Sequence, residues 1–397
     1  MDRFRYTGEE IMKKLEIYIG GDICPTENNE KFFISGEIEK FLDKKIIDKL
    51  SSSDFNVFNF ETTLHDGWSP IKKCGPNLRC NIGCINGLMQ LNPTLIGLAN
   101  NHSLDHGDEA LLNTISIIRE NDVDVVGAGI NLQEAAKAYI FEKNGYKIGI
   151  YACAEHEFTI AASNKPGANP FDPLYSLDHI HALKEKCDFV FVLYHGGKEF
   201  YRYPSPEVQR ICRRMVEKGA DLVITQHTHC IGCREDYLSG VIIYGQGNFI
   251  FDQGDILSLG DMDLTTSMLL INVSIEANRL LVKEIPMILE SGCIKIPSNG
   301  MCEKLRQEYI QRGNEIKQNG FVEEEYSKFA NNMLKSYLNW FVVGNNLLFR
   351  IINRLLNRKM VQYLMNEKRY LAFRNYIECE AHRELLLQGI NNKIDER

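Results

Sequence analysis

Residues 188–229 have the sequence DFVFVLYHGGKEFYRYPSPEVQRICRRMVEKGADLVITQHTH. The stretch contains two short apolar runs with β-branched residues, DFVFVLY and DLVIT, which are typical of buried strands. Between them, SPEVQRICRRMVEKGA has the apolar spacing of an amphipathic helix, with Pro206 near its start and Gly219 at its end. His195 follows the first run, and His227 and His229 follow the second. The stretch therefore predicts a strand, a helix and a strand, with chemically competent side chains where the strands end.

The same alternation extends from residue 15 to about residue 290. The other strand-like runs are LEIYIGG, FNVFNF, LIGLAN, VDVVGAG, YKIGIYA and VIIYGQGNFIF, and DEALLNTISIIRENDV is one of the helix candidates between them. This pattern is typical of a layered α/β fold, in which ligands collect at the carboxyl ends of the strands. We therefore predict the α/β class.

Beyond about residue 300 the sequence changes to long helical stretches rich in Tyr, Leu, Asn, Glu, Lys and Arg. We expect three parts: an N-terminal extension over residues 1–14, the α/β domain over 15–299 and a helical C-terminal subdomain over 300–397. The only histidine in the last part is His382. We therefore expect this subdomain to serve packing or a homo-oligomer contact rather than catalysis.

Composition excludes several classes of protein. The chain has 397 residues, of which 44% are hydrophobic and 25% charged, so it has material for a large core and no signature of disorder. Its 45 Lys and Arg against 53 Asp and Glu give a net charge of −8. Bulk charge therefore does not favour nucleic acid or an anionic membrane as a partner. An anionic substrate requires a local positive site, and bound metal ions can supply one.

The lack of a visible targeting signal and the scattered cysteines predict a cytoplasmic protein. The N-terminal MDRFRYTGEEIMKK lacks the apolar core of a secretory signal, and no run reaches the roughly 18 uncharged apolar residues of a membrane span. The 12 cysteines are scattered, which favours reduced thiols. Cys230 and Cys233 form C-x-x-C beside two histidines, but a structural zinc site needs four ligands, so ordinary buried thiols are favoured.

Five strand-end segments hold nearly all the residues that can bind a metal. They are GGD ending at Asp22, NFE ending at Glu61, ANNH ending at His102, YHGG starting at Tyr194 and QHTH ending at His229. Two carboxylates, an amide oxygen and several imidazoles suit a pair of divalent ions such as Mn, Fe or Zn. Such a pair would clamp a phosphate and lower the pKa of a bridging water toward neutrality.

Each of these residues also has a structural interpretation. Asp22 can be a turn or cap carboxylate, Glu61 a loop acid and Asn101 a left-handed turn residue. His195 can be a hydrogen-bonded core histidine. The pair His227 and His229 is the stronger signal, because H-x-H in extended conformation directs both rings to one side. Because five separate strand ends each deliver a ligand type, we favour a metal site.

The motifs GD, NFE, ANNH, YHGG and QHTH, in this order, resemble the CapA family, which is associated with capsule and poly-γ-glutamate synthesis and belongs to the calcineurin-like metallophosphatase superfamily. Supporting phrases are ANNHSLDHG, VVGAGINLQEAAKAY, KIGIYA, HGGKEFYRYPSPEVQR, GADLVITQHTH and IIYGQGNFIFD, over roughly residues 15–255. The resemblance implies a bacterial protein with a four-layer fold, two sheets sandwiched by helices. It places a metal centre at the loop ends.

The resemblance also implies a set of metal ligands. Asp22 and His229 match ligands of the first metal, and Glu61 matches the bridging carboxylate. His195 and His227 match ligands of the second metal.

Further positions complete the implied site. Asn101 matches the amide ligand, His102 matches the histidine that protonates the leaving oxygen, and Asp105 can orient that imidazole. Cys24 stands where the superfamily usually has a histidine. We expect Cys24 to lie behind the ligands, which leaves the first site one ligand short.

Other residues are expected around this centre. Lys198, Tyr201 and Arg202 can contact an anionic substrate or form a solvated loop, and Asn100 is expected to help bind substrate. Asn248, in a Gly-flanked turn, is expected to position the histidine loops. The turn-rich segment 155–173 can be a lid or a specificity loop.

Three functions remain open at this stage. The first is a metal-dependent phosphoesterase that uses metal-activated hydroxide. The second is an accessory protein of poly-γ-glutamate or capsule synthesis that binds or processes an anionic polymer, although members tied to that pathway generally carry a membrane anchor. The third is a degenerate scaffold.

Overall fold

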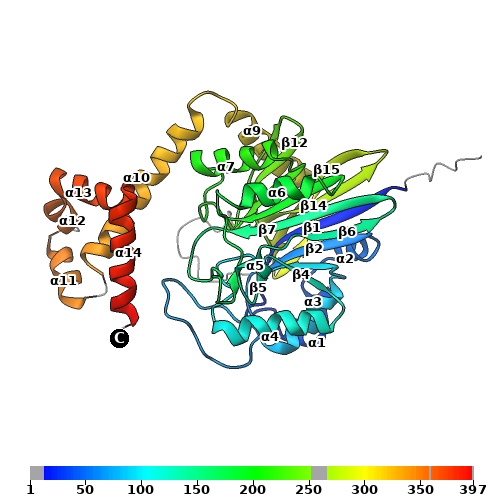
Figure 1. Ribbon diagram of the computed structural model, residues 1–397, viewed down its shortest axis with the longest axis horizontal. Helices are drawn as coiled ribbons and strands as arrows, with labels where there is room; N and C mark the ends of the chain where they lie inside the picture. Colours follow the sequence, from blue (N-terminus) through cyan, green and yellow to red (C-terminus); the bar gives the residue numbers. More distant parts are fainter. Residues whose placement is uncertain (1–12, 252–265, 345, 357–358, 396–397) are drawn as a thin grey trace, which may run out of the picture. The chain divides into compact units, whose positions relative to one another are not determined.

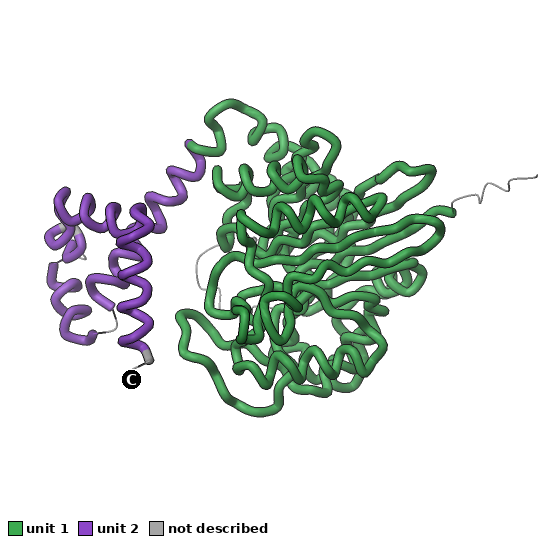
Figure 2. The backbone as a smooth tube through the Cα atoms, viewed as in Figure 1, with its two compact units in different colours: residues 1–323 green, residues 324–397 purple. Residues whose placement is uncertain are grey.

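The alternating apolar runs form two β-sheets in the computed structural model, which describes residues 13–251, 266–344, 346–356 and 359–395 (Figure 1). Most of the predicted N-terminal extension therefore lies outside the described residues. Two compact units divide the chain, residues 1–323 and 324–397 (Figure 2). The candidate site lies in the first unit.

The first sheet has the strand order β16-β15-β14-β1-β2-β3-β4 among the described residues, and β13 pairs with β1 beyond this path. Strands β1 to β4 run parallel, whereas β14, β15 and β16 add antiparallel. The strands are β1 (Leu15–Ile23), β2 (Phe55–Phe60), β3 (Leu95–Gly97), β4 (Asp124–Val126), β13 (Asn248–Ile250), β14 (Ser267–Glu276), β15 (Arg279–Glu290) and β16 (Cys293–Lys295).

The second sheet has the order β11-β12-β10-β9-β7-β6. Its four inner strands β12, β10, β9 and β7 are parallel. The strands are β6 (Tyr139–Lys143), β7 (Tyr146–Ala154), β9 (Phe189–His195), β10 (Leu222–Gln226), β11 (Ile231–Tyr237) and β12 (Gly240–Gln246). A short separate pair is formed by β5 (Ala128–Gly129) and β8 (Gly167–Ala168).

Helices cover the outer face of each sheet, and Figure 1 shows α6 and α7 on one side and α1, α3 and α4 on the other. The first set is α1 (Glu30–Ser35), α2 (Lys44–Ser51), α3 (Ile85–Gln90) and α4 (Gly107–Glu120), with short turns η1 (Ile38–Lys40) and η2 (Ile82–Cys84). The second set is α6 (Ser176–Lys184), α7 (Pro206–Glu217) and α9 (Asn299–Glu315). The short α5 (Leu132–Ala135) follows β5.

Three hydrophobic cores separate four layers. In β9, Phe191 and Leu193 face the core between the sheets, whereas Val192 and Tyr194 face the core under α6 and α7. The third core lies between the first sheet and α1 to α4. Because successive strand side chains point to opposite faces, an apolar run such as FVFVLY fills two cores at once. The predicted α/β fold with two sheets sandwiched by helices is confirmed.

The sequence after the last strand is helical, as predicted. The helix α9 packs on β11 and belongs to the first unit, where Tyr309 joins the core between the sheets. The remaining helices are α10 (Phe321–Val342), α11 (Leu347–Leu355), α12 (Met360–Leu364), α13 (Glu367–Glu378) and α14 (Glu380–Asp395). Among the described residues, none of the helices is both long enough and apolar enough to cross a membrane.

Candidate metal centre

The predicted ligands lie at strand ends from both sheets. Asp22 is the second-last residue of β1, Glu61 follows β2 directly, and His195 is the last residue of β9. Asn59 of β2 lies opposite Asp22, and Gln226 of β10 lies opposite His195, so neighbouring parallel strands end at matching positions. The carboxyl ends of parallel strands meet at one edge of a sheet, which explains how distant segments converge.

The histidines after β10 do not have the predicted extended conformation. His227 has φ +76° and His229 has φ +55°, both in the left-handed region that non-glycine residues rarely adopt. The two ring centroids still lie 6.0 Å apart. The prediction of extended geometry is wrong because the chain leaves the sheet after Gln226 and turns across the strand ends. Strained backbone of this kind persists where the surrounding structure holds it, and it gathers at functional sites.

Three groups of side chains bring possible ligand atoms within 4.8 Å of one another. The first group is Asp22, Glu61 and His229, and the second is Glu61, His195 and His227. Glu61 is common to both, as a carboxylate that bridges two ions must be. The third group joins His227 and His229 to Glu199. Asn101 adjoins the second group, with its Oδ1 atom 3.0 Å from His195 Nε2.

Unpartnered buried atoms show that these residues fit a metal. Glu61 is fully buried, and neither carboxylate oxygen has a hydrogen-bond partner among the described residues, although Oε1 lies 3.3 Å from His195 Nε2. Nδ1 of the buried His227 also has no partner in the described chain. A buried ionisable side chain without partners is costly unless a charge or a metal compensates for it. The donor set of carboxylates, imidazoles and one amide oxygen is the set that divalent first-row ions accept.

The surroundings shift the pKa values of the Asp22 and Glu61 carboxyl groups in opposite directions. Burial, assisted by the charge of Glu61, raises the pKa of Asp22 to about 6. Burial also acts to raise the pKa of Glu61, but the charges of His229 and His195 outweigh it and lower that pKa. Two acids this close ionise together only beside positive charge. In this site that charge comes from histidines, and a bound cation would supply it more strongly.

Two of the histidines, His227 and His229, present a ring nitrogen to the site. Burial and the neighbouring charges of His195 and His229 keep the pKa of His227 well below its ordinary value, so its ring is neutral, the form that binds metals. His229 Nδ1 donates to Asn248 Oδ1 at 2.8 Å, which leaves Nε2 available. Asn248 itself lies beside Asp22, because β13 pairs with β1 at that position. The contact agrees with the positioning role predicted for Asn248.

Asn59 is a site residue that the sequence analysis missed. Its Nδ2 donates to Asp22 Oδ1 at 2.7 Å and lies 3.2 Å from His195 Nδ1, while its Oδ1 accepts from Asn100 at 3.1 Å. The signal was a polar residue in the middle of the buried run FNVFNF, two positions before Glu61. Asn59 holds one carboxylate and one imidazole from different sheets in place.

We predict that Asn59→Ala lowers the affinity for Mn²⁺ about 10- to 100-fold, because an outer hydrogen-bonding partner orients two ligands. The control is Asn56→Ala on the same strand, whose buried Nδ2 donates to Leu50 and Asn92 carbonyls far from the ligands. Both variants should lose about 1–3 kcal/mol of stability in urea unfolding, since each leaves buried groups unpaired. Equal Mn²⁺ affinities for the two variants would contradict the role of Asn59.

His102 and Asp105 form the predicted pair. His102 Nδ1 donates to Asp105 Oδ2 at 2.6 Å, which leaves Nε2 free. Lys73, which the sequence analysis missed, forms an ion pair with Asp105, and its Nζ lies 3.2 Å from His102 Nδ1. The Lys73 side chain is 2% exposed and the Asp105 side chain 0%. Lys73 comes from an irregular loop without periodic pattern, so only the fold reveals its position.

Cys24 and Asn100 lie behind the ligands. The Cys24 thiol is buried, contacts the Pro25 carbonyl and belongs to none of the metal-competent groups among the described residues. Burial and the charge of Glu61 raise its pKa well above the ordinary value, so it stays protonated. Asn100 donates to Asn59 Oδ1 and the Phe60 carbonyl. Its Oδ1 accepts from the backbone N–H of His102 and the hydroxyl of Ser103, so its hydrogen-bonding capacity is used within the protein.

The mouth of the centre is acidic. A small hollow beside the ligands is lined by Asn101, Ala154, Glu155, Glu157, His195 and His227. Lys198 Nζ lies 3.9 Å from Glu155, and the guanidinium of Arg202 lies 3.6 Å from Glu308 of α9. The Tyr201 ring is buried 6.0 Å from that of Tyr203. Of these three predicted substrate contacts, only Lys198 is placed beside the hollow by the observed contacts, and the Glu155 carboxylate faces it.

The predicted lid, segment 155–173, is tied to the centre. Its Thr159 hydroxyl donates to the Asn100 carbonyl at 2.7 Å, and Asn169 Nδ2 donates to the Ala152 carbonyl at 2.8 Å. Thr159 and Asn169 are both buried. These contacts make the segment a fixed wall beside the ligands.

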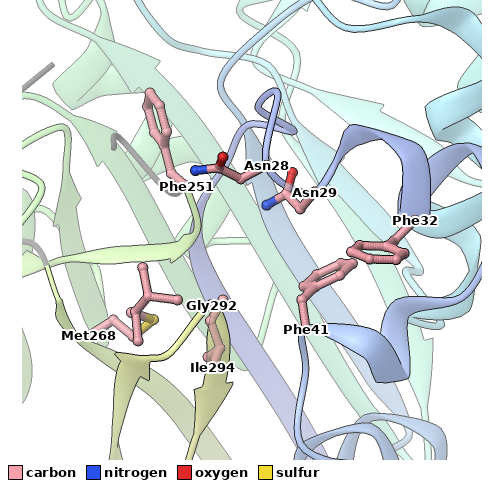
Figure 3. A pocket seen from close by; sticks show the side chains of 9 residues that line it. Asn28, Asn29, Phe32, Phe41, Phe251, Met268, Gly292 and Ile294 are labelled. Atoms are coloured by element: carbon pink, nitrogen blue, oxygen red, sulfur yellow. The ribbon is translucent and has the colours of Figure 1, made fainter. Parts of the chain in front are cut away.

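A second hollow lies next to the centre (Figure 3). Phe251, whose ring lies edge-on to His229 at 5.4 Å, forms part of its wall. Its volume is about 60 Å³, and its lining consists of Asn28, Asn29, Phe32, Phe41, Phe251, Met268, Leu289, Gly292 and Ile294. Ligand pockets usually measure about 300–1,000 Å³. This hollow is too small for a substrate, and its lining contains no His, Cys, Asp or Glu among the described residues.

The chain is similar to known proteins over the region that contains the candidate metal centre. A family model described as "Bacterial capsule synthesis protein PGA_cap" matches residues 16–253. The "PGA biosynthesis protein CapA" of Bacillus subtilis (strain 168) is 28% identical over 267 residues, which is 64% of this chain and 70% of that protein. The "Capsule biosynthesis protein CapA" of Bacillus anthracis is 30% identical over 214 residues. That match spans 52% of each chain, so only about half of the B. anthracis protein is represented.

Solved structures resemble the chain at low sequence identity. A crystal structure described as a novel phosphatase from Mycoplasma pneumoniae is 15% identical, with a TM-score of 0.45. The likeness covers 76% of this chain and 100% of that one.

Proposed function

The chain belongs to the bacterial capsule synthesis protein family, and from this premise we propose that it is a metal-dependent hydrolase of the phosphoesterase type. The observation that carries the proposal is the sharing of Glu61 by two ligand groups at the ends of two sheets. Two ions about 3.5–4 Å apart, joined by one carboxylate, are an arrangement that metal-dependent phosphatases and nucleases use. The unpartnered oxygens of Glu61 support the same conclusion.

Each ligand has a defined role in this proposal. Asp22 and His229 would hold the first ion, and His195 and His227, with Asn101, the second. Glu61 would hold both. When bound, the ions supply Lewis acidity, which polarises the phosphoryl oxygens and makes a water nucleophilic near neutral pH.

His102 would move the proton. Asp105 fixes the imidazole through Nδ1, so that Nε2 is the atom that can deliver a proton to the departing oxygen. Lys73 neutralises Asp105 from its other oxygen and holds the carboxylate in this orientation. The charge of His102 is among the causes that lower the pKa of Glu61, which agrees with a position close to the ligands.

We predict that His102→Gln lowers turnover of an alkyl phosphate about 10²- to 10⁴-fold, because Gln cannot deliver a proton. The effect on p-nitrophenyl phosphate should be much smaller, since its leaving group departs without protonation. Glycerol phosphate and p-nitrophenyl phosphate, assayed with the same Mn²⁺-loaded protein, provide the comparison. Equal losses on both esters would argue against His102 as the general acid.

The proposal itself is tested by hydrolysis of p-nitrophenyl phosphate and bis(p-nitrophenyl) phosphate before and after removal of metal. We expect turnover that disappears with a chelator and returns with Mn²⁺. His227→Ala should remain folded and inactive. If this variant hydrolyses either ester at the parental rate, or if the protein holds no metal by elemental analysis, the proposal is wrong and the degenerate scaffold is favoured.

A second candidate function is that of an accessory protein in poly-γ-glutamate or capsule synthesis, which binds or processes an anionic polymer. The names of the Bacillus relatives favour it. The acidic residues Glu155 and Glu157 at the mouth oppose a polyanion unless bound ions offset them. Incubation with poly-γ-glutamate, with and without Mn²⁺, separates the two functions. Metal-dependent binding or cleavage of the polymer favours this candidate, whereas inertness toward the polymer together with ester hydrolysis favours the first.

A further inference from the structure

Within the part of the chain that the structure describes, the first-metal group offers three carboxylate or imidazole donors, Asp22, Glu61 and His229. Cys24 does not add a fourth, because its buried thiol belongs to none of the ligand groups among the described residues and contacts the Pro25 carbonyl. First-row ions in proteins usually take at least four ligands, and the fourth can be a water or a further side chain. A side chain from another part of the chain can therefore complete the site.

Glu199 is in position to be that donor. One of its carboxylate oxygens lies within 4.8 Å of ring nitrogens of both His227 and His229. The two histidines are buried, whereas Glu199 is exposed in the loop that follows β9. Nδ1 of His227 has no hydrogen-bond partner in the described chain, and His227 is only 6% exposed. Glu199 therefore places an outer carboxylate beside two buried imidazoles, a donor set that a divalent cation accepts.

The loop fixes Glu199 against the histidines. The next residue, Phe200, has φ +60°, a conformation that costs a bulky residue about 1–3 kcal/mol. Its backbone N–H donates to the Thr228 carbonyl at 2.9 Å, between the two histidines. Its ring lies 5.9 Å from that of His229. These two contacts compensate for the backbone strain and couple the position of Glu199 to the histidine loop.

We infer that Glu199 is an additional metal ligand, which joins His229 and His227 from the exposed loop after β9 and supplies a donor that Cys24 does not. The inference rests on the metal centre proposed above. The ligands Asp22, Glu61 and His229 are buried, and hydrogen bonds hold Asp22 and His229 in place, whereas Glu199 is exposed. Glu199 is therefore the ligand that an incoming substrate oxygen can displace without moving the rest of the centre.

The test is a titration of the full chain with Mn²⁺, in which the electron paramagnetic resonance signal measures the free Mn²⁺. Glu199→Gln should lower the affinity for one of the two Mn²⁺ ions by about 10- to 100-fold or more. Loss of even an outer hydrogen-bonding partner of a ligand has an effect of that size. The matched control is Glu157→Gln, which removes the same charge from the same mouth but belongs to none of the ligand groups among the described residues. Because exposed charge is screened by salt, the control should stay within about twofold of the parental protein.

His195→Ala serves as the reference, because it should lose the second ion instead. If Glu199→Gln binds both ions like the parental protein while His195→Ala loses one, the role of Glu199 is overturned and the metal centre stands. If Glu199→Gln and Glu157→Gln weaken binding equally, the effect is general charge, and the inference is again overturned. If the parental protein binds no Mn²⁺, both the inference and the proposed function fail.

Discussion

Glu61→Gln is expected to lower Mn²⁺ affinity at both positions by more than about 100-fold, a larger loss than removal of an outer partner produces. Both ligand groups contain Glu61, so one substitution affects two ions. Glutamine has nearly the same shape, and neither carboxylate oxygen of Glu61 has a hydrogen-bond partner to lose in the described chain. The variant should therefore fold but show no metal-dependent turnover.

Thermal unfolding gives a second measurement of the same effect. A ligand present at 100 times its Kd stabilises a protein by about 2.7 kcal/mol, so Mn²⁺ should raise the Tm of the parental protein. This increase should vanish in Glu61→Gln. The matched control is Glu235→Gln, which alters another buried glutamate, one that pairs with Arg213 and Tyr244 far from the ligand groups. The control should lose stability but keep its response to Mn²⁺. A Glu61→Gln protein that still gains stability from Mn²⁺ would exclude Glu61 as a shared ligand.

Lys73→Met is expected to have the largest effect on stability, about 3–5 kcal/mol, because it leaves Asp105 as a buried charge without its counterion. The side chains of Lys73 and Asp105 are 2% and 0% exposed. Asp105 keeps its bonds from His102 Nδ1 and the Leu78 N–H, which places the expected loss near 3 kcal/mol. Urea unfolding of the metal-free protein measures this loss.

Two further variants make the result specific. Lys44→Met removes the same charge from an exposed lysine of α2 and should change stability by less than about 0.5 kcal/mol. The double variant Lys73→Met, Asp105→Asn removes both charges and should be more stable than the sum of the single losses predicts, by at least about 1 kcal/mol. Strict additivity would mean that the two side chains do not form the buried pair described here.

The strands, and the order in which their ends supply ligands, could be predicted because both depend on local sequence. An apolar run such as FVFVLY marks a strand with two buried faces, and the histidines that follow these runs mark strand ends. The motif order indicated the family, and the family match covers residues 16–253. The extended geometry predicted for His227 and His229 was wrong, because their left-handed backbone depends on contacts with other loops rather than on the H-x-H spacing.

The contacts of three residues could not be predicted from the sequence pattern. Asn59 connects Asp22 to His195, Lys73 pairs with Asp105, and Glu199 approaches His229. Their roles depend on contacts between side chains that are as many as 136 positions apart in the chain. No periodic pattern marks such a contact, because periodicity reports only which face of a strand or helix a residue occupies.

The sequence alone determined the layered α/β class and the chemical types of the metal donors. The spacing of apolar residues and the identity of each residue are local properties that the sequence contains directly. The resemblance implied that Glu61 is shared and that Cys24 lies behind the ligands, but only the tertiary structure showed the two ligand groups that contain Glu61. It alone placed the buried Lys73 beside His102. The physical reason is that burial and electrostatic interaction depend on distances through space, and these exist only once both sheets have packed together.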